Sequence, residues 1–268
     1  MQRIPVLMYH SISDNPGPGF RRFAISPSVF SEQLEYLCDG GYCPMTVSQL
    51  AAVIRTGAEL PQKPVVLTFD DGFADFYTNA LPALMRLQLT ATLYLVTACI
   101  GQTSRWLERE GEADRAMLTW DQLRQIEQSG IECGSHAHTH PRLDDLPPRD
   151  AADEIAGSKG ILDRHLRSPV TSFCYPYGYF STAVRQAVQH AGYTSACAAG
   201  YELCSLESDP FALSRLIVTP DMTLDHFANM LSGRAAQTRE RILAAAYKAF
   251  RRLLRLRLAY PGRESDGF

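Results

Sequence analysis

An acidic pair follows an apolar run in VVLTFDDG, residues 65–72. Neighbouring side chains of an extended chain point to opposite sides, so Asp70 and Asp71 can serve different tasks. One could face a metal ion and the other a substrate. Taken alone, the same letters also fit a turn with two solvated carboxylates that Gly72 closes.

Three alternating histidines occupy GSHAHTHP, residues 134–141. Imidazole is the commonest metal ligand in proteins, and zinc accepts nitrogen and oxygen ligands. His136 and His140 are four residues apart, so a helical turn or a tight loop can bring both to one ion, whereas His138 could replace either in an extended arrangement. With Asp71, two histidines give three protein ligands and leave positions open, which is typical of a catalytic metal site. The alternative is a surface loop with polar histidines.

Two further stretches place polar groups at the end of an apolar run. In FCYPYG, residues 173–178, Tyr175 and Tyr177 offer faces on which sugars stack, and the backbone N–H of Tyr177 is available to a developing oxyanion. An ordinary aromatic turn is the alternative. In VLMYHSIS, residues 6–13, His10 ends an apolar strand, and a core histidine held by hydrogen bonds is the alternative.

Short apolar runs alternate with helical patterns along most of the chain. Strands are predicted at residues 5–9, 65–69, 91–96, 131–135, 171–175, 194–198 and 215–218, and helices at residues 28–38, 74–88, 119–129, 149–166, 181–191 and 223–231. Such alternation is typical of a parallel α/β sheet, and seven strands favour closure into a barrel. The polar motifs each follow a different predicted strand, so we expect them to meet at the C-terminal face, where α/β barrels carry their active sites.

The composition is that of a globular chain. Of 268 residues, 46% are hydrophobic and 21% are charged, which is enough for one substantial core. No apolar run is long enough to span a membrane, and the first residues show no usable signal peptide, so we expect a cytoplasmic protein. The seven cysteines form no CxxC pair and several lie in apolar runs, so we expect free, buried thiols.

The end of the chain differs in charge from the rest. From residue 237 onward eight Lys/Arg and three Asp/Glu give +5, so the preceding residues carry −8, since the total is −3. We predict a barrel domain over residues 1–235 and a basic amphipathic helix and tail over residues 236–268. The helix, residues 237–258, either contacts anionic lipid at the inner membrane surface or packs on the barrel. Nucleic acid is not an expected partner, because the body is acidic.

TFDDG, SHAHTHP and YPYG, in this order, resemble the polysaccharide deacetylase family, the nodulation-deacetylase homology domain of carbohydrate esterase family 4. The YH near the N-terminus is similar to the poly-N-acetylglucosamine deacetylase-like subgroup. The resemblance covers residues 4–220 and implies a distorted (β/α)7 barrel that hydrolyses acetamide groups on N-acetylated sugars. It also implies one divalent metal ion, zinc in the first place and cobalt or nickel as alternatives.

The resemblance implies a role for each matching residue. Asp70 would be the general base, and Asp71, His136 and His140 would hold the metal ion. The backbone N–H of Tyr177 would stabilise the oxyanion. This division agrees with the chemistry, because a metal ion acidifies water and polarises a carbonyl while a nearby carboxylate takes the proton as water attacks.

Three positions depart from the family pattern. Many members carry an arginine that orients the base where this chain has Cys174; we expect Arg215 to replace it, although an arginine on the surface rim is the alternative. Ala137 replaces a Ser/Thr that forms a loop hydrogen bond. The family's Leu-x-His, which protonates the leaving amine, is missing here. A barrel closes its first strand against its last, so we expect His10 to take this role.

The sequence therefore predicts a metal-dependent carbohydrate N-deacetylase. Its substrate would be a glycan, a glycolipid or a lipid-linked intermediate of exopolysaccharide biosynthesis. Two other functions stay open. One is an amidohydrolase that opens a small cyclic amide on the same fold, and the other is a catalytically silent glycan-binding or membrane-scaffold protein.

Overall fold

The computed structural model describes residues 2–234. The strands are β1 (Val6–Tyr9), β2 (Ser11–Ile12), β3 (Ala24–Ile25), β4 (Cys43–Met45), β5 (Pro64–Phe69), β6 (Thr92–Leu95), β7 (Glu132–Ser135), β8 (Ser172–Cys174), β9 (Ser195–Cys197) and β10 (Leu216–Ile217). The α-helices are α1 (Pro27–Asp39), α2 (Val47–Thr56), α3 (Leu81–Arg86), α4 (Trp120–Gln128), α5 (Pro148–His165), α6 (Thr182–His190) and α7 (Leu224–Leu231). Shorter helical turns are η1 (Arg21–Phe23), η2 (Phe76–Ala80), η3 (Thr97–Cys99), η4 (Arg105–Glu110), η5 (Leu143–Asp145) and η6 (Pro176–Gly178).

The main sheet is parallel and runs in the order β10-β1-β5-β6-β7-β8-β9, with β4 added beside β5. Its two ends approach each other through the segment that contains β10. Leu216 pairs with Leu7 of β1, and Leu213 forms a parallel bridge to Cys197 of β9. The predicted distorted (β/α)7 barrel is therefore confirmed, with an irregular closure at residues 213–217.

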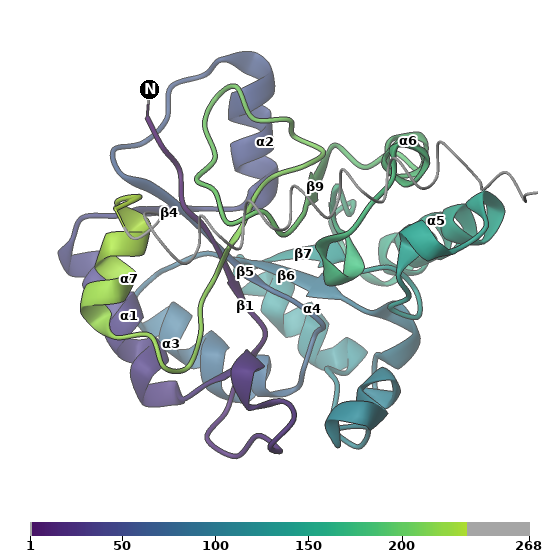
Figure 1. The fold of residues 1–268 in the computed structure, drawn as a ribbon, viewed down its shortest axis with the longest axis horizontal. Coiled ribbons are helices and arrows are strands. Elements are labelled where there is room, and N and C mark those ends of the chain that lie inside the picture. The colour runs from purple at the N-terminus through teal and green to yellow at the C-terminus, as the bar shows by residue number, and fades with distance from the viewer. Residues whose placement is uncertain (1, 235–268) are drawn as a thin grey trace, which may run out of the picture.

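Helices cover the outside of the strands (Figure 1). Helices α1, α3 and α7 lie together on one flank, and α5 and α6 lie together on another. Strand β5 is buried along its whole length, as its apolar run predicts. This arrangement leaves the C-terminal ends of the strands to carry the polar motifs.

Every predicted strand and helix within the described residues is present, with ends that shift by a few residues. The predicted helix 74–88 instead begins as the wider turn η2 and continues as α3, because Pro82 has no N–H to donate to the preceding turn. The prediction omitted α2 and the short strands β2, β3 and β4. Yet α2 carries a clear start signal, a capping box between Thr46 and Gln49.

The cysteines of the chain are free thiols, as expected. All seven cysteines are free, and five of them are buried. Between residues 2 and 234, no helix combines the length and apolar character needed to cross a membrane. The predicted basic helix at 237–258 and the domain boundary at 235/236 lie outside the described residues.

Candidate active site

A cavity of about 540 Å³ opens at the C-terminal ends of the barrel strands. Its lining includes all seven residues that the sequence analysis selected: His10, Asp70, Asp71, His136, His140, Tyr177 and Arg215. Six of them follow the C-terminal ends of β1, β5, β7 and β8, and Arg215 immediately precedes β10. The barrel thus gathers into one cavity residues that lie far apart in the sequence.

Asp71, His136 and His140 form one buried cluster of potential metal ligands. Asp71 Oδ1 lies 3.6 Å from His136 Nε2 and 3.4 Å from His140 Nε2. These separations are too long for good hydrogen bonds, but ligands held about 2.0–2.1 Å from a tetrahedral zinc ion stand about 3.4 Å apart. Within residues 2–234, Asp71 Oδ1, the oxygen that faces both imidazoles, has no hydrogen-bond partner. The donor set therefore fits a divalent cation.

The pKa of Asp71 also indicates a cation site. Burial, and then the neighbouring Asp70 carboxylate, raise the pKa of Asp71 well above its usual range. A buried carboxylate beside a second one needs a cation to remain ionised. A metal ion between Asp71 and the two histidines would supply that charge.

Backbone turns of an uncommon kind direct these ligands. Asp71, Ala137, His140 and Tyr177 all have positive φ, between 60° and 75°. Non-glycine residues rarely adopt this conformation, and such residues concentrate at functional sites. Gly72 has φ +84°, and a Cβ there would lie 2.9 Å from a methyl group of Leu95, so only glycine closes the turn after the acidic pair.

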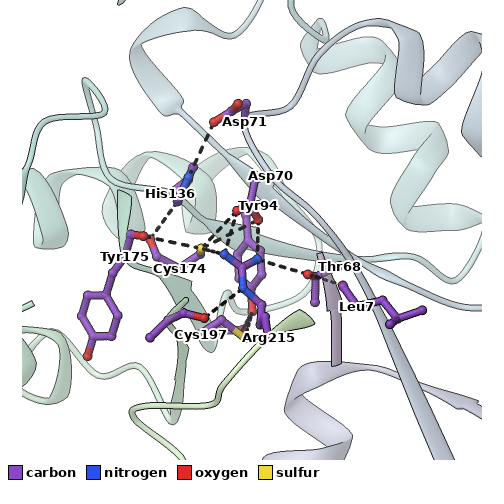
Figure 2. Close-up of polar contacts among 12 residues, drawn as sticks. Leu7, Thr68, Asp70, Asp71, Tyr94, His136, Cys174, Tyr175, Cys197 and Arg215 are labelled. Carbon is purple, nitrogen blue, oxygen red and sulfur yellow. Dashed lines mark hydrogen bonds and ion pairs between the residues drawn. The ribbon is translucent and has the colours of Figure 1, made fainter. Parts of the chain in front are cut away.

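His136 is oriented by the strand next to it. Its Nδ1 lies 2.8 Å from the carbonyl oxygen of Cys174, to which it donates a hydrogen bond (Figure 2). That bond places the proton on Nδ1 and leaves the Nε2 lone pair directed at the Asp71 side, as in most histidines that bind metals.

His138 does not belong to the cluster. Its Nδ1 lies 2.9 Å from Thr97 Oγ1, on η3. Of the two arrangements that the sequence left open, the structure therefore brings together His136 and His140, the pair four residues apart.

Asp70 is held by Arg215 in a two-point ion pair (Figure 2). Nη1 donates to Asp70 Oδ1 at 2.6 Å and Nη2 to Oδ2 at 2.7 Å. The remaining donors reach Thr68 Oγ1, the Ala198 carbonyl and Cys174 Sγ. All five N–H groups of the guanidinium are thus satisfied, although Arg215 is only 1% exposed. Arg215 is an internal residue of the site, not a rim arginine.

This pairing sets the charge of the acidic group. Burial alone would raise the pKa of Asp70, but the guanidinium of Arg215 outweighs burial and holds the pKa well below its usual range. Asp70 is therefore ionised near neutral pH and fixed in orientation.

His10 lines the cavity, as predicted, and its ring packs 4.9 Å from the ring of Phe23. Burial lowers the pKa of His10 to about 4. The Asp70 carboxylate raises this pKa but offsets the effect of burial only in part. The imidazole is consequently neutral near pH 7. Its place suits the predicted proton donor, but it has to acquire the proton during the reaction.

The two tyrosines of YPYG differ in their surroundings. Tyr177 is 51% exposed, and its ring centroid lies 4.8 Å from that of His140, so it offers a face at the cavity mouth. Tyr175 is buried and its hydroxyl donates to the Phe211 carbonyl. The prediction that Tyr175 offers a stacking face to a sugar is therefore wrong. The apolar wall also includes Trp106, 5.2 Å from the His140 ring, which no sequence motif indicated.

Comparison with known proteins agrees with this site. A family model described as polysaccharide deacetylase matches residues 57–196. The YxkH protein of Bacillus subtilis is 28% identical over 221 residues, 82% of this chain and 73% of that protein. The poly-beta-1,6-N-acetyl-D-glucosamine N-deacetylase of Escherichia coli is 32% identical over 134 residues, 48% of this chain but only 20% of that protein.

Solved structures give the same class. The Streptococcus pyogenes deacetylase PplD, determined in complex with acetate, superposes with a TM-score of 0.75 at 26% identity, covering 86% of this chain and 98% of that one. The chain belongs to the polysaccharide deacetylase family and is a carbohydrate deacetylase, a hydrolase. The matched range of the family model includes the acidic pair, both metal-site histidines and Tyr177, but neither His10 nor Arg215.

Proposed function

We propose that the protein hydrolyses the acetamide of an N-acetylated sugar and releases acetate and a free amine. The observation that carries the proposal is the placement of the Asp71/His136/His140 cluster beside an Asp70 carboxylate that Arg215 fixes, at one cavity. One cation site and one oriented base are the two parts that metal-assisted hydrolysis of an amide requires.

Asp71, His136 and His140 would hold the cation. When bound, a divalent ion would polarise the amide carbonyl and lower the pKa of an attacking water. Zinc is the first choice, because two imidazoles and a carboxylate are among its usual ligands; cobalt and nickel accept the same donors.

Asp70 would accept the proton from the attacking water. Its low pKa makes it a weak base, and its contribution therefore lies in being ionised and correctly aimed. The two-point contact with Arg215 fixes that aim. The backbone N–H of Tyr177, at the cavity wall, would donate to the oxygen on which negative charge develops.

His10 would return a proton to the leaving amine. Because its imidazole is neutral at rest, it would carry the proton only after the water has been deprotonated. Asp70 would pass on to His10 the proton that it took from the water. The Asp70 carboxylate, ionised again, would then stabilise the imidazolium until the leaving amine takes the proton.

The glycan is the finer part of the proposal. The Escherichia coli relative is named for poly-beta-1,6-N-acetyl-D-glucosamine, so a β-1,6-linked N-acetylglucosamine oligomer is the first substrate to test. We further propose a cytoplasmic location, contact of residues 237–258 with the inner membrane surface, and a lipid-linked sugar as substrate. The seven free thiols and the basic sequence of that segment support this part.

The test is acetate release by the zinc-loaded protein. The substrates are a β-1,6-linked N-acetylglucosamine oligomer, a β-1,4-linked oligomer and an N-acetylated glycolipid, with a small cyclic amide as the competing substrate and His140→Ala as the inactive control. We expect acetate from at least one N-acetylated sugar and none with His140→Ala. Ring opening of the cyclic amide without acetate release would favour the amidohydrolase, and no turnover of any kind would favour a silent binding protein.

A further inference from the structure

Glu154, on α5, reaches the short loop that separates the two histidines of the metal cluster. Its Oε2 accepts hydrogen bonds from the backbone N–H groups of His138 and Thr139, both at 2.8 Å. Its Oε1 accepts a third bond from the Thr139 hydroxyl at 2.6 Å. One side chain therefore makes three hydrogen bonds to residues 138 and 139.

The residues of this loop do not themselves favour its conformation. Ala137 has no polar side chain, and both Ala137 and His140 have positive φ, so the loop conformation is not one that its own residues prefer. Helix turn η3 contributes three further hydrogen bonds to the loop. Thr97 N–H donates to the Ala137 carbonyl at 3.3 Å, Ala98 N–H donates to the His138 carbonyl at 2.9 Å, and His138 Nδ1 and Thr97 Oγ1 share a bond of 2.9 Å. Glu154 and η3 therefore both hold residues 137–139 by hydrogen bonds.

We propose that Glu154 is a positioning residue of the metal centre, and that it sets metal affinity by keeping His136 and His140 at their mutual distance and angle. This inference rests on the proposed cation site. Glu154 would touch neither the ion nor the substrate, and it would act only through residues 138 and 139.

The chemistry of glutamine gives a sharp comparison. In Glu154→Gln the amide oxygen can accept both backbone N–H groups, and the amide NH₂ can donate to the Thr139 hydroxyl, which is able to accept. The three contacts can thus survive without the charge. Glu154→Ala loses all three. Asp153→Ala, an exposed neighbour on the same helix, removes a negative charge from α5 and serves as the matched control.

The experiment is a zinc titration of the metal-free full-length proteins against a chromophoric chelator, followed by the absorption spectrum of the cobalt-loaded forms. We expect Glu154→Ala to weaken zinc binding about 10- to 100-fold and to change the cobalt spectrum, the usual size of an effect from residues that orient ligands. Glu154→Gln and Asp153→Ala should stay close to the wild type in both measurements.

His140→Ala separates this inference from the cation site itself. If His140→Ala weakens zinc binding but Glu154→Ala does not, Glu154 has no positioning role. If His140→Ala binds zinc like the wild type, the proposed cation site is wrong. Equal weakening by Glu154→Ala and Glu154→Gln would show that charge, not the hydrogen bonds, matters, and would overturn the positioning role.

A folding defect in Glu154→Ala would leave a milder variant for the same question. Thr139→Val removes only the hydroxyl contact to Glu154 at an exposed position. We expect a smaller loss of zinc affinity in the same direction, and an unchanged affinity would contradict the proposal.

Discussion

Arg215 and Asp70, 145 residues apart in sequence, form a two-point ion pair in the interior of the barrel. Arg215 lies in the segment that closes the sheet between β9 and β1. The closure of the barrel therefore also brings Arg215 to Asp70 and orients the base. Cys174 Sγ lies 3.0 Å from Arg215 Nη2, and its small thiol leaves room for the guanidinium. The position at which many family members carry an arginine is thus filled from another strand.

Loss of the guanidinium should destabilise the fold. Arg215→Met leaves a buried, unpaired carboxylate, which typically costs about 3–5 kcal/mol of the free energy of unfolding. The double variant Asp70→Asn/Arg215→Met should be more stable than Arg215→Met, because no unpaired charge remains. Urea denaturation of the three proteins measures this, and a double variant no more stable than Arg215→Met would contradict the pairing.

His10→Ala should slow turnover while metal binding stays intact. A positioned general acid typically contributes about 10²–10⁴-fold to the rate, so a loss of kcat in that range is expected. Metal content and the kinetics of acetate release measure the two quantities separately. A variant with unchanged kcat would show that the amine takes its proton from another group.

The pKa of His10 also predicts a pH dependence of stability. The folded-state pKa of about 4 lies below the ordinary 6.5, so the unfolded chain binds this proton more readily than the folded one. The contribution of the neutral imidazole is therefore complete above about pH 6.5 and is lost as the pH falls from there to about 4. Urea denaturation of the metal-free protein across this window should show a steeper loss for the wild type than for His10→Asn. Parallel curves would contradict the assignment.

Removal of the metal ion should lower both activity and stability. The cation would offset the burial and the repulsion from Asp70 that together raise the pKa of Asp71, so it would bind the folded chain preferentially. Zinc at 100 times its dissociation constant should add about 2.7 kcal/mol to the free energy of unfolding. Thermal unfolding with a chelator and after zinc is restored measures the shift, and His140→Ala should not respond.

The sequence allowed the main architecture and most of the site to be predicted because each part has a local signal. Strand β5 reads as an apolar run, and its acidic pair follows without a gap. The spacing of His136 and His140 indicated a shared ion, although only the structure separates them from His138. The capping box of helix α2 is also a local signal, although no helix was predicted at these residues.

The remaining features depend on contacts across the fold and had no local signal. The pairing of Arg215 with Asp70 requires the barrel to close, and the sequence could name Arg215 only as one of two interpretations. Burial decided that Tyr175 is a core residue and Tyr177 is not. The neutral state of His10 also follows from burial. Glu154 lies on a helix face with nothing in its sequence context to connect it with the histidine loop.

The most direct test of the proposed division of roles is a paired measurement on Asp70→Asn, in which acetate release and bound metal are determined on the same sample. Asparagine preserves the size of the side chain but cannot accept a proton as a carboxylate does. We expect Asp70→Asn to bind about one metal ion per chain, as the wild type does, and to lose nearly all turnover. Full turnover in Asp70→Asn would contradict the assignment of Asp70 as the base and, with it, the proposed mechanism.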